Sequence, residues 1–213
     1  MHVRQLAVEG AYVFTPTIHR DDRGWFVSPH QQGPFEDAVG GPLFSVAQTS
    51  FSESRRNVVR GVHYRLTPPG SAKYTCCVRG RALDIVVDLR LGSPTFGRWD
   101  SVIIDPQTFR SMYLPVGVGH AFVALEEGTV VSYLLSEPYR SSEELAVNVC
   151  DPALGLPLPE GYEALLSDRD RAAPTIAQMR AAGLLPDYQV CQEIEARARS
   201  AAGTAVDGGP VVR

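Results

Sequence analysis

The 213-residue sequence lacks the features of membrane, secreted and nucleic-acid-binding proteins. No stretch approaches the roughly 18 apolar residues of a membrane-spanning helix, and residues 1–12 contain Arg4 and Glu9 in place of an apolar signal core. The 20 basic and 24 acidic residues are interspersed, with a net charge of -4 and no basic block that would follow a phosphate backbone. We therefore expect a cytoplasmic protein that binds neither membranes nor nucleic acid.

Motifs of several common enzyme classes are also missing. The sequence has no GxGxxG after a strand, no GxxxxGK[ST] phosphate loop and no GxSxG nucleophile elbow. It therefore lacks the motifs by which dinucleotide-binding proteins, P-loop NTPases and α/β-hydrolases are identified. The four cysteines show neither disulfide-framework nor CxxC zinc spacing, and we expect buried, reduced thiols. Any catalysis must therefore come from side chains or from a metal.

Lysine is nearly absent. Lys73 is the only one, and arginine supplies every other basic residue. A lone lysine can arise by chance, but an ammonium differs from a guanidinium in being a compact charge with a tunable pKa. Lys73 is therefore a candidate site residue.

Short runs rich in Val, Ile, Phe and Tyr are present from residue 12 to about residue 149, separated by Gly, Pro, Asp and Ser. They predict an antiparallel sandwich or barrel with strands at 43–51, 73–79, 82–89, 99–104, 111–114, 120–125 and 130–135. Helical patterns appear only at 175–182 and 188–200. We expect a mainly β domain over residues 1–174, a helical extension over 175–202 that packs on it at the periphery, and a flexible tail over 203–213.

Two histidines lie in a pattern related to metal-binding cupins, a superfamily of small β-barrels. The P-x-G-x-x-H element that ends at His120 resembles the second cupin motif, although this motif alone is weakly specific. The first motif supplies a His-x-His pair and a later glutamate, but here the corresponding residues are His63, Arg65 and, near the glutamate position, Lys73. Because cationic groups disfavour a divalent ion, we expect no metal site.

The same residues suit an anionic substrate instead. Inward-facing Arg60, His63, Lys73 and His120 would attract a polyanion such as a diphosphate. An isolated histidine is more often a satisfied core residue than a catalytic one. Beside Arg60 and a lysine, however, a buried His63 would not stabilise the fold by packing, and we interpret it as a site residue.

Five segments carry a resemblance to a known family: 59–63 (VRGVH), 87–97 (VDLRLGSPTFG), 114–120 (LPVGVGH), 151–155 (DPALG) and 166–170 (LSDRD). Through them the sequence resembles the dTDP-4-dehydrorhamnose 3,5-epimerase family from about residue 21 to residue 174. The VDLR-x-GSPTFG string is the most specific of the five. The resemblance implies a cupin-type jelly roll that forms a homodimer, uses no cofactor and inverts C3, C5 or both carbons of a dTDP-4-keto-6-deoxyhexose.

The resemblance also assigns roles to residues. It implies His63 as the base, Asp170 as its carboxylate partner, Tyr133 as the acid on the opposite face of the sugar and Lys73 near the keto oxygen. The substrate contacts that it implies are Arg60, His120, Arg23, Phe26, Gln48 and Tyr139, with Arg23 and Phe26 directed to a neighbouring subunit's pocket. Without the resemblance, nothing in the sequence would select Tyr133 over Tyr139.

The expected chemistry requires these residue types. A ketone at C4 acidifies the hydrogens on C3 and C5, but a histidine removes one only if the enolate oxygen meets fixed positive charge or donors. Inversion then needs an acid on the other face of the ring, and an acid or a base each contributes roughly 10²- to 10⁴-fold. A base, an acid and a cation are therefore the minimal set.

Three positions depart from the family pattern: Ser28 replaces an acidic residue, Ser50 an asparagine and Leu134 a lysine. The extension beyond Pro174 resembles that of epimerases from antibiotic deoxysugar pathways. We expect an epimerase that acts at C3, with C5 as a second candidate centre. The alternatives are a non-catalytic cupin that binds a sugar nucleotide and a dTDP-sugar 3,4-ketoisomerase.

Overall fold

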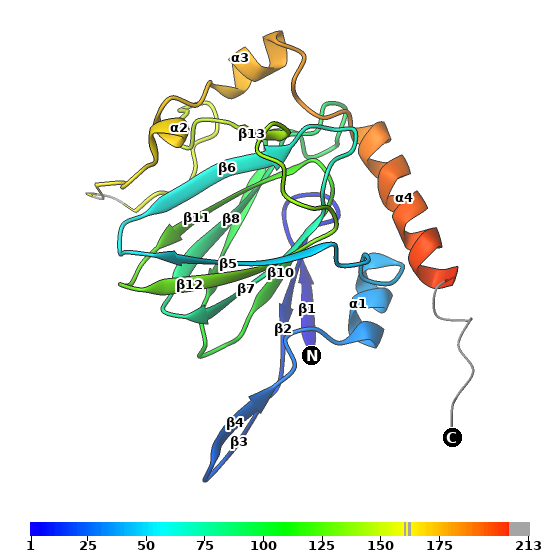
Figure 1. The fold of residues 1–213 in the computed structure, drawn as a ribbon, viewed down its shortest axis with the longest axis vertical. Helices are drawn as coiled ribbons and strands as arrows, with labels where there is room; N and C mark the ends of the chain where they lie inside the picture. Colours follow the sequence, from blue (N-terminus) through cyan, green and yellow to red (C-terminus); the bar gives the residue numbers. More distant parts are fainter. Residues whose placement is uncertain (160, 162, 205–213) are drawn as a thin grey trace.

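The computed structural model describes residues 1–159, 161 and 163–204. Its strands are β1 (His2–Gln5), β2 (Tyr12–Thr15), β3 (Ile18–Asp21), β4 (Gly24–Val27), β5 (Gln48–Ser54), β6 (Val59–Arg65), β7 (Lys73–Arg79), β8 (Ala82–Asp88), β9 (Trp99–Ile104), β10 (Ser111–Leu114), β11 (Val118–Ala124), β12 (Thr129–Leu135) and β13 (Glu144–Ala146). The larger sheet has the order β1-β2-β10-β7-β12-β5 and the smaller has β13-β6-β11-β8-β9. The two sheets face each other as a sandwich, from which the β3–β4 hairpin projects (Figure 1). This arrangement confirms the predicted mainly β jelly roll.

The helices lie around the sandwich (Figure 1); those near 175–182 and 188–200 were predicted, whereas those at Gln32–Val39 and Asp168–Arg171 were not. They are α1 (Gln32–Val39), α2 (Asp168–Arg171), α3 (Ile176–Ala181) and α4 (Tyr188–Thr204). A capping box between Thr175 and Gln178 starts α3. Gly203 and Thr204, which we expected in a flexible tail, belong to α4, and the remainder of that tail lies outside the described residues. Within the described chain, each helix is too short or too polar to cross a membrane.

Apolar side chains lie on both faces of β8 and β11, two inner strands of the smaller sheet. Val86 and Phe122 point into the sandwich, whereas Ile85 and Val123 pack beneath the segment that carries Met179. β8 and β11 are therefore apolar along most of their length instead of alternating between apolar and polar residues. This double burial makes them recognisable as strands in the sequence.

The prediction failed at two of the strands that carry functional residues, whereas β7 with Lys73 and β12 with Tyr133 lie close to their predicted ranges. β6 was not among the predicted strands, and β5 runs from Gln48 to Ser54 instead of over 43–51. Polar residues and a glycine interrupt the apolar pattern of β6, because one of its faces lines a cavity. The thiol prediction also fails at one position, since Cys150 is exposed.

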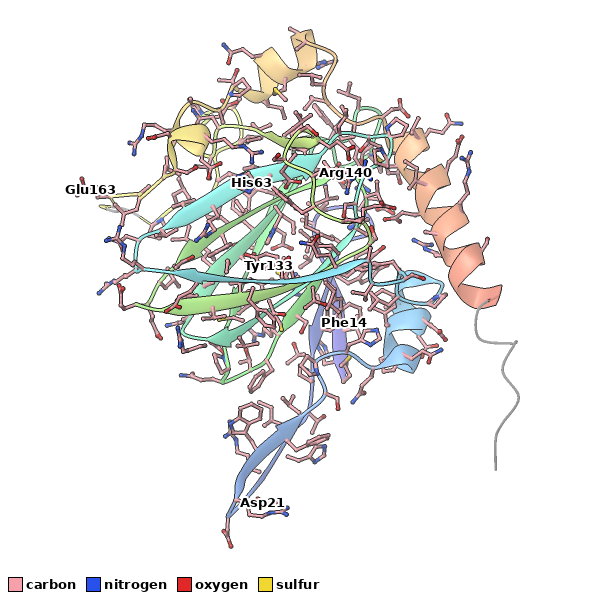
Figure 2. All side chains as sticks on the ribbon, in the orientation of Figure 1. Phe14, Asp21, His63, Tyr133, Arg140 and Glu163 are labelled. Atoms are coloured by element: carbon pink, nitrogen blue, oxygen red, sulfur yellow. The ribbon has the colours of Figure 1, made fainter. Side chains whose placement is uncertain are left out.

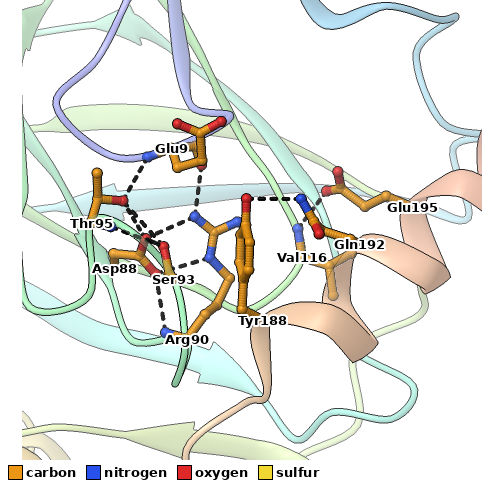
Figure 3. Close-up of polar contacts among 9 residues, drawn as sticks. All are labelled: Glu9, Asp88, Arg90, Ser93, Thr95, Val116, Tyr188, Gln192 and Glu195. Atoms are coloured by element: carbon orange, nitrogen blue, oxygen red, sulfur yellow. Dashed lines mark hydrogen bonds and ion pairs between the residues drawn. The ribbon is translucent and has the colours of Figure 1, made fainter.

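The most specific sequence motif has a structural role (Figure 3). The buried Asp88 carboxylate accepts hydrogen bonds from Arg90 Nε (2.9 Å), Ser93 Oγ (2.6 Å) and Thr95 Oγ1 (2.5 Å). Burial raises the pKa of Asp88, but these donors and the Arg90 charge outweigh it and hold the pKa below its usual value. The Arg90 guanidinium lies over the ring of Tyr188, 5.0 Å from its centroid, and so connects the motif to α4.

Candidate active site

A β-bulge in β6 brings two site residues to one face. His63 pairs with His120 of β11, but Arg60 pairs with Phe122. The three-residue step from Arg60 to His63 in β6 therefore lies opposite a two-residue step in β11. In a regular strand, residues three apart point to opposite faces. The bulge contains Gly61 with φ of 119°, and a Cβ there would lie 2.4 Å from the carbonyl oxygen of His120. Only glycine therefore fits this position.

A cavity of about 310 Å³ lies between the two sheets. The predicted residues that line it are His63, Lys73, Tyr133, Arg60, His120, Gln48 and Tyr139. His63 comes from β6 of the smaller sheet and Tyr133 from β12 of the larger one, so they belong to opposite walls (Figure 2). The sandwich thus brings together residues that the sequence places far apart.

His63 is oriented from behind by Asp170 of α2. Its Nε2 lies 2.6 Å from Asp170 Oδ1, and the Asp170 side chain is only 4% exposed. Burial raises the pKa of Asp170, but hydrogen bonds from His63, Ser167 and the Gly61 N–H lower it below its usual value. The carboxylate is therefore ionised at neutral pH and fixes the Nε2–H tautomer of His63, which leaves Nδ1 free to accept a proton.

A second histidine–carboxylate pair lies deeper in the sandwich. His120 Nε2 forms a short hydrogen bond with Asp84 of β8, and Thr75 Oγ1 of the opposite sheet donates to Asp84 Oδ2 at 3.0 Å. Both carboxylate oxygens of this fully buried residue are thus satisfied. Asp84 was not among the predicted site residues, although a charged residue within the apolar run of β8 is itself a signal of a buried, paired group.

Tyr133 presents a protonated phenol to the cavity. Its OH lies 2.9 Å from Ser52 Oγ, and its ring packs edge-on against His120, with 6.1 Å between the ring centroids. Burial, more than any neighbouring charge, raises the pKa of Tyr133. The phenol is therefore neutral at physiological pH and able to donate a proton.

Cations line the remaining wall of the cavity. Lys73 Nζ lies 3.6 Å from Glu144 Oε1, with only 12% of the lysine side chain exposed. Arg60 Nε donates to Ser54 Oγ at 3.1 Å. A second hollow of about 530 Å³ shares His63, Arg60, Tyr139 and Glu144 with the first and adds Arg55 and Arg169. The two hollows are therefore adjacent, and the outer one is rich in arginine.

Comparison with known proteins identifies the family. The family model described as dTDP-4-dehydrorhamnose 3,5-epimerase matches residues 5–178. The chain belongs to this epimerase family.

Individual relatives agree with this assignment. The dTDP-4-dehydrorhamnose 3,5-epimerase of Mycolicibacterium smegmatis is 44% identical over 192 residues, which cover 90% of this chain and 94% of the relative. The dTDP-4-dehydro-6-deoxyglucose 3-epimerase of Streptomyces bikiniensis is 46% identical, with coverages of 88% and 95%. An epimerase structure from Mycobacterium tuberculosis superimposes with a TM-score of 0.89 at 43% identity and covers 93% of this chain and 100% of its own. A 3'-monoepimerase from Streptomyces bikiniensis, solved with dTDP-quinovose, gives a TM-score of 0.86 at 45% identity, with coverages of 91% and 98%.

Two of the predicted contacts of this epimerase lie outside the cavity. Arg23 and Phe26 belong to the projecting β3–β4 hairpin, where Arg23 pairs with Asp21 at 2.5 Å and Phe26 is 69% exposed. The neighbouring Trp25 is 53% exposed. Within one chain, neither Arg23 nor Phe26 lines the cavity around His63.

His63 and His120 each form a hydrogen bond with a carboxylate. Within the described residues, no group of three or more His, Cys, Asp or Glu side chains is arranged to hold a metal ion. Ser52 and Glu144, the partners of Tyr133 and Lys73, were also not among the predicted site residues. No local pattern marks either residue, because both contacts join separate strands.

Proposed function

We propose that this protein inverts C3 of a dTDP-4-keto-6-deoxyhexose by proton transfer through an enolate, without a cofactor. The observation that carries the proposal is the placement of His63, backed by Asp170, and Tyr133 on opposite walls of one cavity that also contains Lys73. Proton removal from one face of a sugar and proton delivery to the other need this arrangement.

In the proposed reaction, Nδ1 of His63 removes the proton from the carbon beside the C4 ketone. The C–H electron pair moves into a C3–C4 double bond, and the ketone oxygen becomes an enolate that the Lys73 ammonium stabilises. The Asp170 carboxylate stabilises the imidazolium that forms. Tyr133 then donates its phenolic proton to the opposite face of the carbon, the carbonyl reforms, and the centre is inverted.

The substrate's other groups match the rest of the site. Arg60, together with Arg55 and Arg169 in the outer hollow, supplies positive charge for a diphosphate. Gln48 and Tyr139 are already joined, because the Tyr139 N–H donates to Gln48 Oε1 at 2.8 Å, and we assign them to substrate binding. The exposed Arg23 and Phe26 suit a role in a neighbouring subunit's pocket, which would make the working unit a homodimer.

Relatives support the chemistry and leave both carbons as candidates. Those with 40–46% identity include 3-epimerases and 3,5-epimerases, several from Streptomyces. A Streptomyces bikiniensis 3'-monoepimerase was solved with dTDP as a double mutant in which a histidine becomes asparagine and a tyrosine becomes phenylalanine. The separation of those two positions equals that of His63 and Tyr133. We place the enzyme in the antibiotic type of deoxysugar pathway and assign C5 as a second candidate centre.

Hydrogen exchange tests the proposal directly. Incubation of the dTDP-4-keto-6-deoxyhexose in deuterated water should place deuterium at the inverted carbon, and NMR at C3 and C5 over time shows which centre reacts. His63→Asn should abolish exchange at both carbons. Tyr133→Phe should permit exchange but impair inversion, because His63 can return a solvent-derived proton to the same face.

Other outcomes would support other functions. Saturable binding without exchange at either carbon would indicate a non-catalytic sugar-nucleotide-binding protein. A product whose carbonyl has moved from C4 to C3 would indicate a 3,4-ketoisomerase. Equal exchange by the wild-type enzyme and His63→Asn would remove His63 as the base.

A further inference from the structure

The inner face of β5 carries a row of serine hydroxyls that contact the site from one edge. Residues 50, 52 and 54 alternate along the strand and therefore share a face. Each bonds a different side chain of the site: Gln48 Nε2 donates to Ser50 Oγ at 2.8 Å, Ser52 Oγ lies 2.9 Å from Tyr133 OH, and Arg60 Nε donates to Ser54 Oγ at 3.1 Å. Ser52 is thus the member that contacts the proposed acid.

The contact between Ser52 and Tyr133 crosses two strands diagonally. In the register of β5 and β12, Tyr133 lies directly opposite Ser50, whereas Ser52 lies opposite Val131. The phenol nevertheless reaches Ser52, while Ser50 is engaged by Gln48. Among the hydrogen bonds of the described residues, the one with Ser52 is the only one that the Tyr133 hydroxyl makes.

In the proposed reaction, the Tyr133 oxygen needs a hydrogen-bond donor and a source of protons, and Ser52 can supply both. Donation to carbon leaves Tyr133 as a phenolate in a partly buried position, where an anion without a donor is disfavoured. The phenolate must also regain a proton before the next turnover. Ser52 is partly exposed and lines the cavity, so water that enters the cavity can reach its hydroxyl.

We propose that Ser52 positions the Tyr133 phenol for delivery to carbon and returns the proton to it after each inversion. This inference rests on the proposed epimerase function. In the return step, the Ser52 O–H bond breaks as its proton passes to the phenolate oxygen, while a water molecule gives a proton to Ser52 Oγ. The resulting hydroxide is neutralised by the proton that His63 took from the sugar, so no net proton is consumed.

Ser52→Ala separates this role from a merely structural one. In deuterated water, total exchange at the reacting carbon reports the His63 side of the reaction, and the ratio of inversion to exchange reports the Tyr133 side. We expect Ser52→Ala to lower this ratio by about tenfold to a hundredfold, because the phenolate loses its hydrogen bond. Total exchange should stay within about threefold of wild type. Ser52→Thr, which keeps the hydroxyl, should restore most of the ratio.

Ser132→Ala provides a matched control. Ser132 precedes Tyr133 on β12, is absent from the cavity lining and, by the alternation of the strand, points to the other face of the sheet. The same chemical change there should leave the ratio unaltered. If Ser52→Ala fails to fold, Ser52→Cys keeps the side-chain size with a weaker donor and should lower the ratio in the same direction.

The outcomes distinguish this inference from the proposed function. A wild-type ratio in Ser52→Ala, or an equal fall of exchange and inversion in that variant, would overturn the role of Ser52 while leaving the epimerase intact. An absence of exchange in the wild-type enzyme would overturn the proposed function itself.

Discussion

Replacement of Asp170 by asparagine tests whether a charge behind His63 supports the base. The amide keeps the shape of the side chain, and its oxygen still accepts from Nε2, which lies 2.6 Å from Oδ1 in the native pair. What is lost is the negative charge that stabilises the imidazolium. A hydrogen bond to a charged group contributes about 1.5–3 kcal/mol, and about 1.4 kcal/mol corresponds to tenfold in rate. We therefore expect deuterium exchange to slow by roughly 10- to 150-fold.

The assay is NMR-detected exchange at saturating and limiting substrate. Because Asp170 lies behind His63 and does not line the main cavity, the loss should appear in kcat, with KM nearly unchanged. Asp168→Asn removes the same charge from an exposed position on the same helix and should have little effect. An exchange rate within about threefold of wild type in folded Asp170→Asn, or equal losses in both variants, would refute the reasoning.

Two further predictions concern the cavity cation and the buried motif. Lys73→Met should lower kcat by about 10²- to 10³-fold in steady-state kinetics, and Lys73→Arg should recover only part, since a planar guanidinium cannot take the place of a compact ammonium. Equal activity of Lys73→Arg and wild type would contradict this. Asp88→Asn should destabilise the fold by about 3 kcal/mol in urea unfolding, because it leaves Arg90 buried without its counter-charge. The native pKa of Asp88 is depressed, so its stabilisation is present above the unfolded pKa of about 3.9 and is lost as pH falls through the native pKa. The stability gap between wild type and Asp88→Asn should therefore be constant from about pH 7 to 5 and narrow below about pH 4, and a gap that widens in acid would contradict the pairing.

Strands with a continuous run of apolar and β-branched residues were predictable, including β7 and β12, which contribute Lys73 and Tyr133 to the cavity. β7, β9 and β10 coincide with their predicted ranges, because their apolar and β-branched residues reflect burial in the sandwich. β6 escaped prediction because its inner face carries Arg60 and His63, which line the cavity, and because its bulge interrupts the alternation. In β6, the functional residues thus interrupt the apolar pattern on which strand prediction depends.

The sequence by itself determined the fold class and the family, and it singled out His63, Lys73 and the GSPTFG string through local residue patterns. The resemblance implied Asp170 as the partner of His63 and Tyr133 as the acid, but only the tertiary structure decided the contacts themselves. Asp170 Oδ1 lies against His63 Nε2, Tyr133 lies in the opposite sheet, and Ser52 contacts its phenol. Such contacts join residues that are distant in the chain, and their geometry depends on sheet order, register and one β-bulge. Local periodicity records which face of a strand is buried, but it does not record which strand lies opposite.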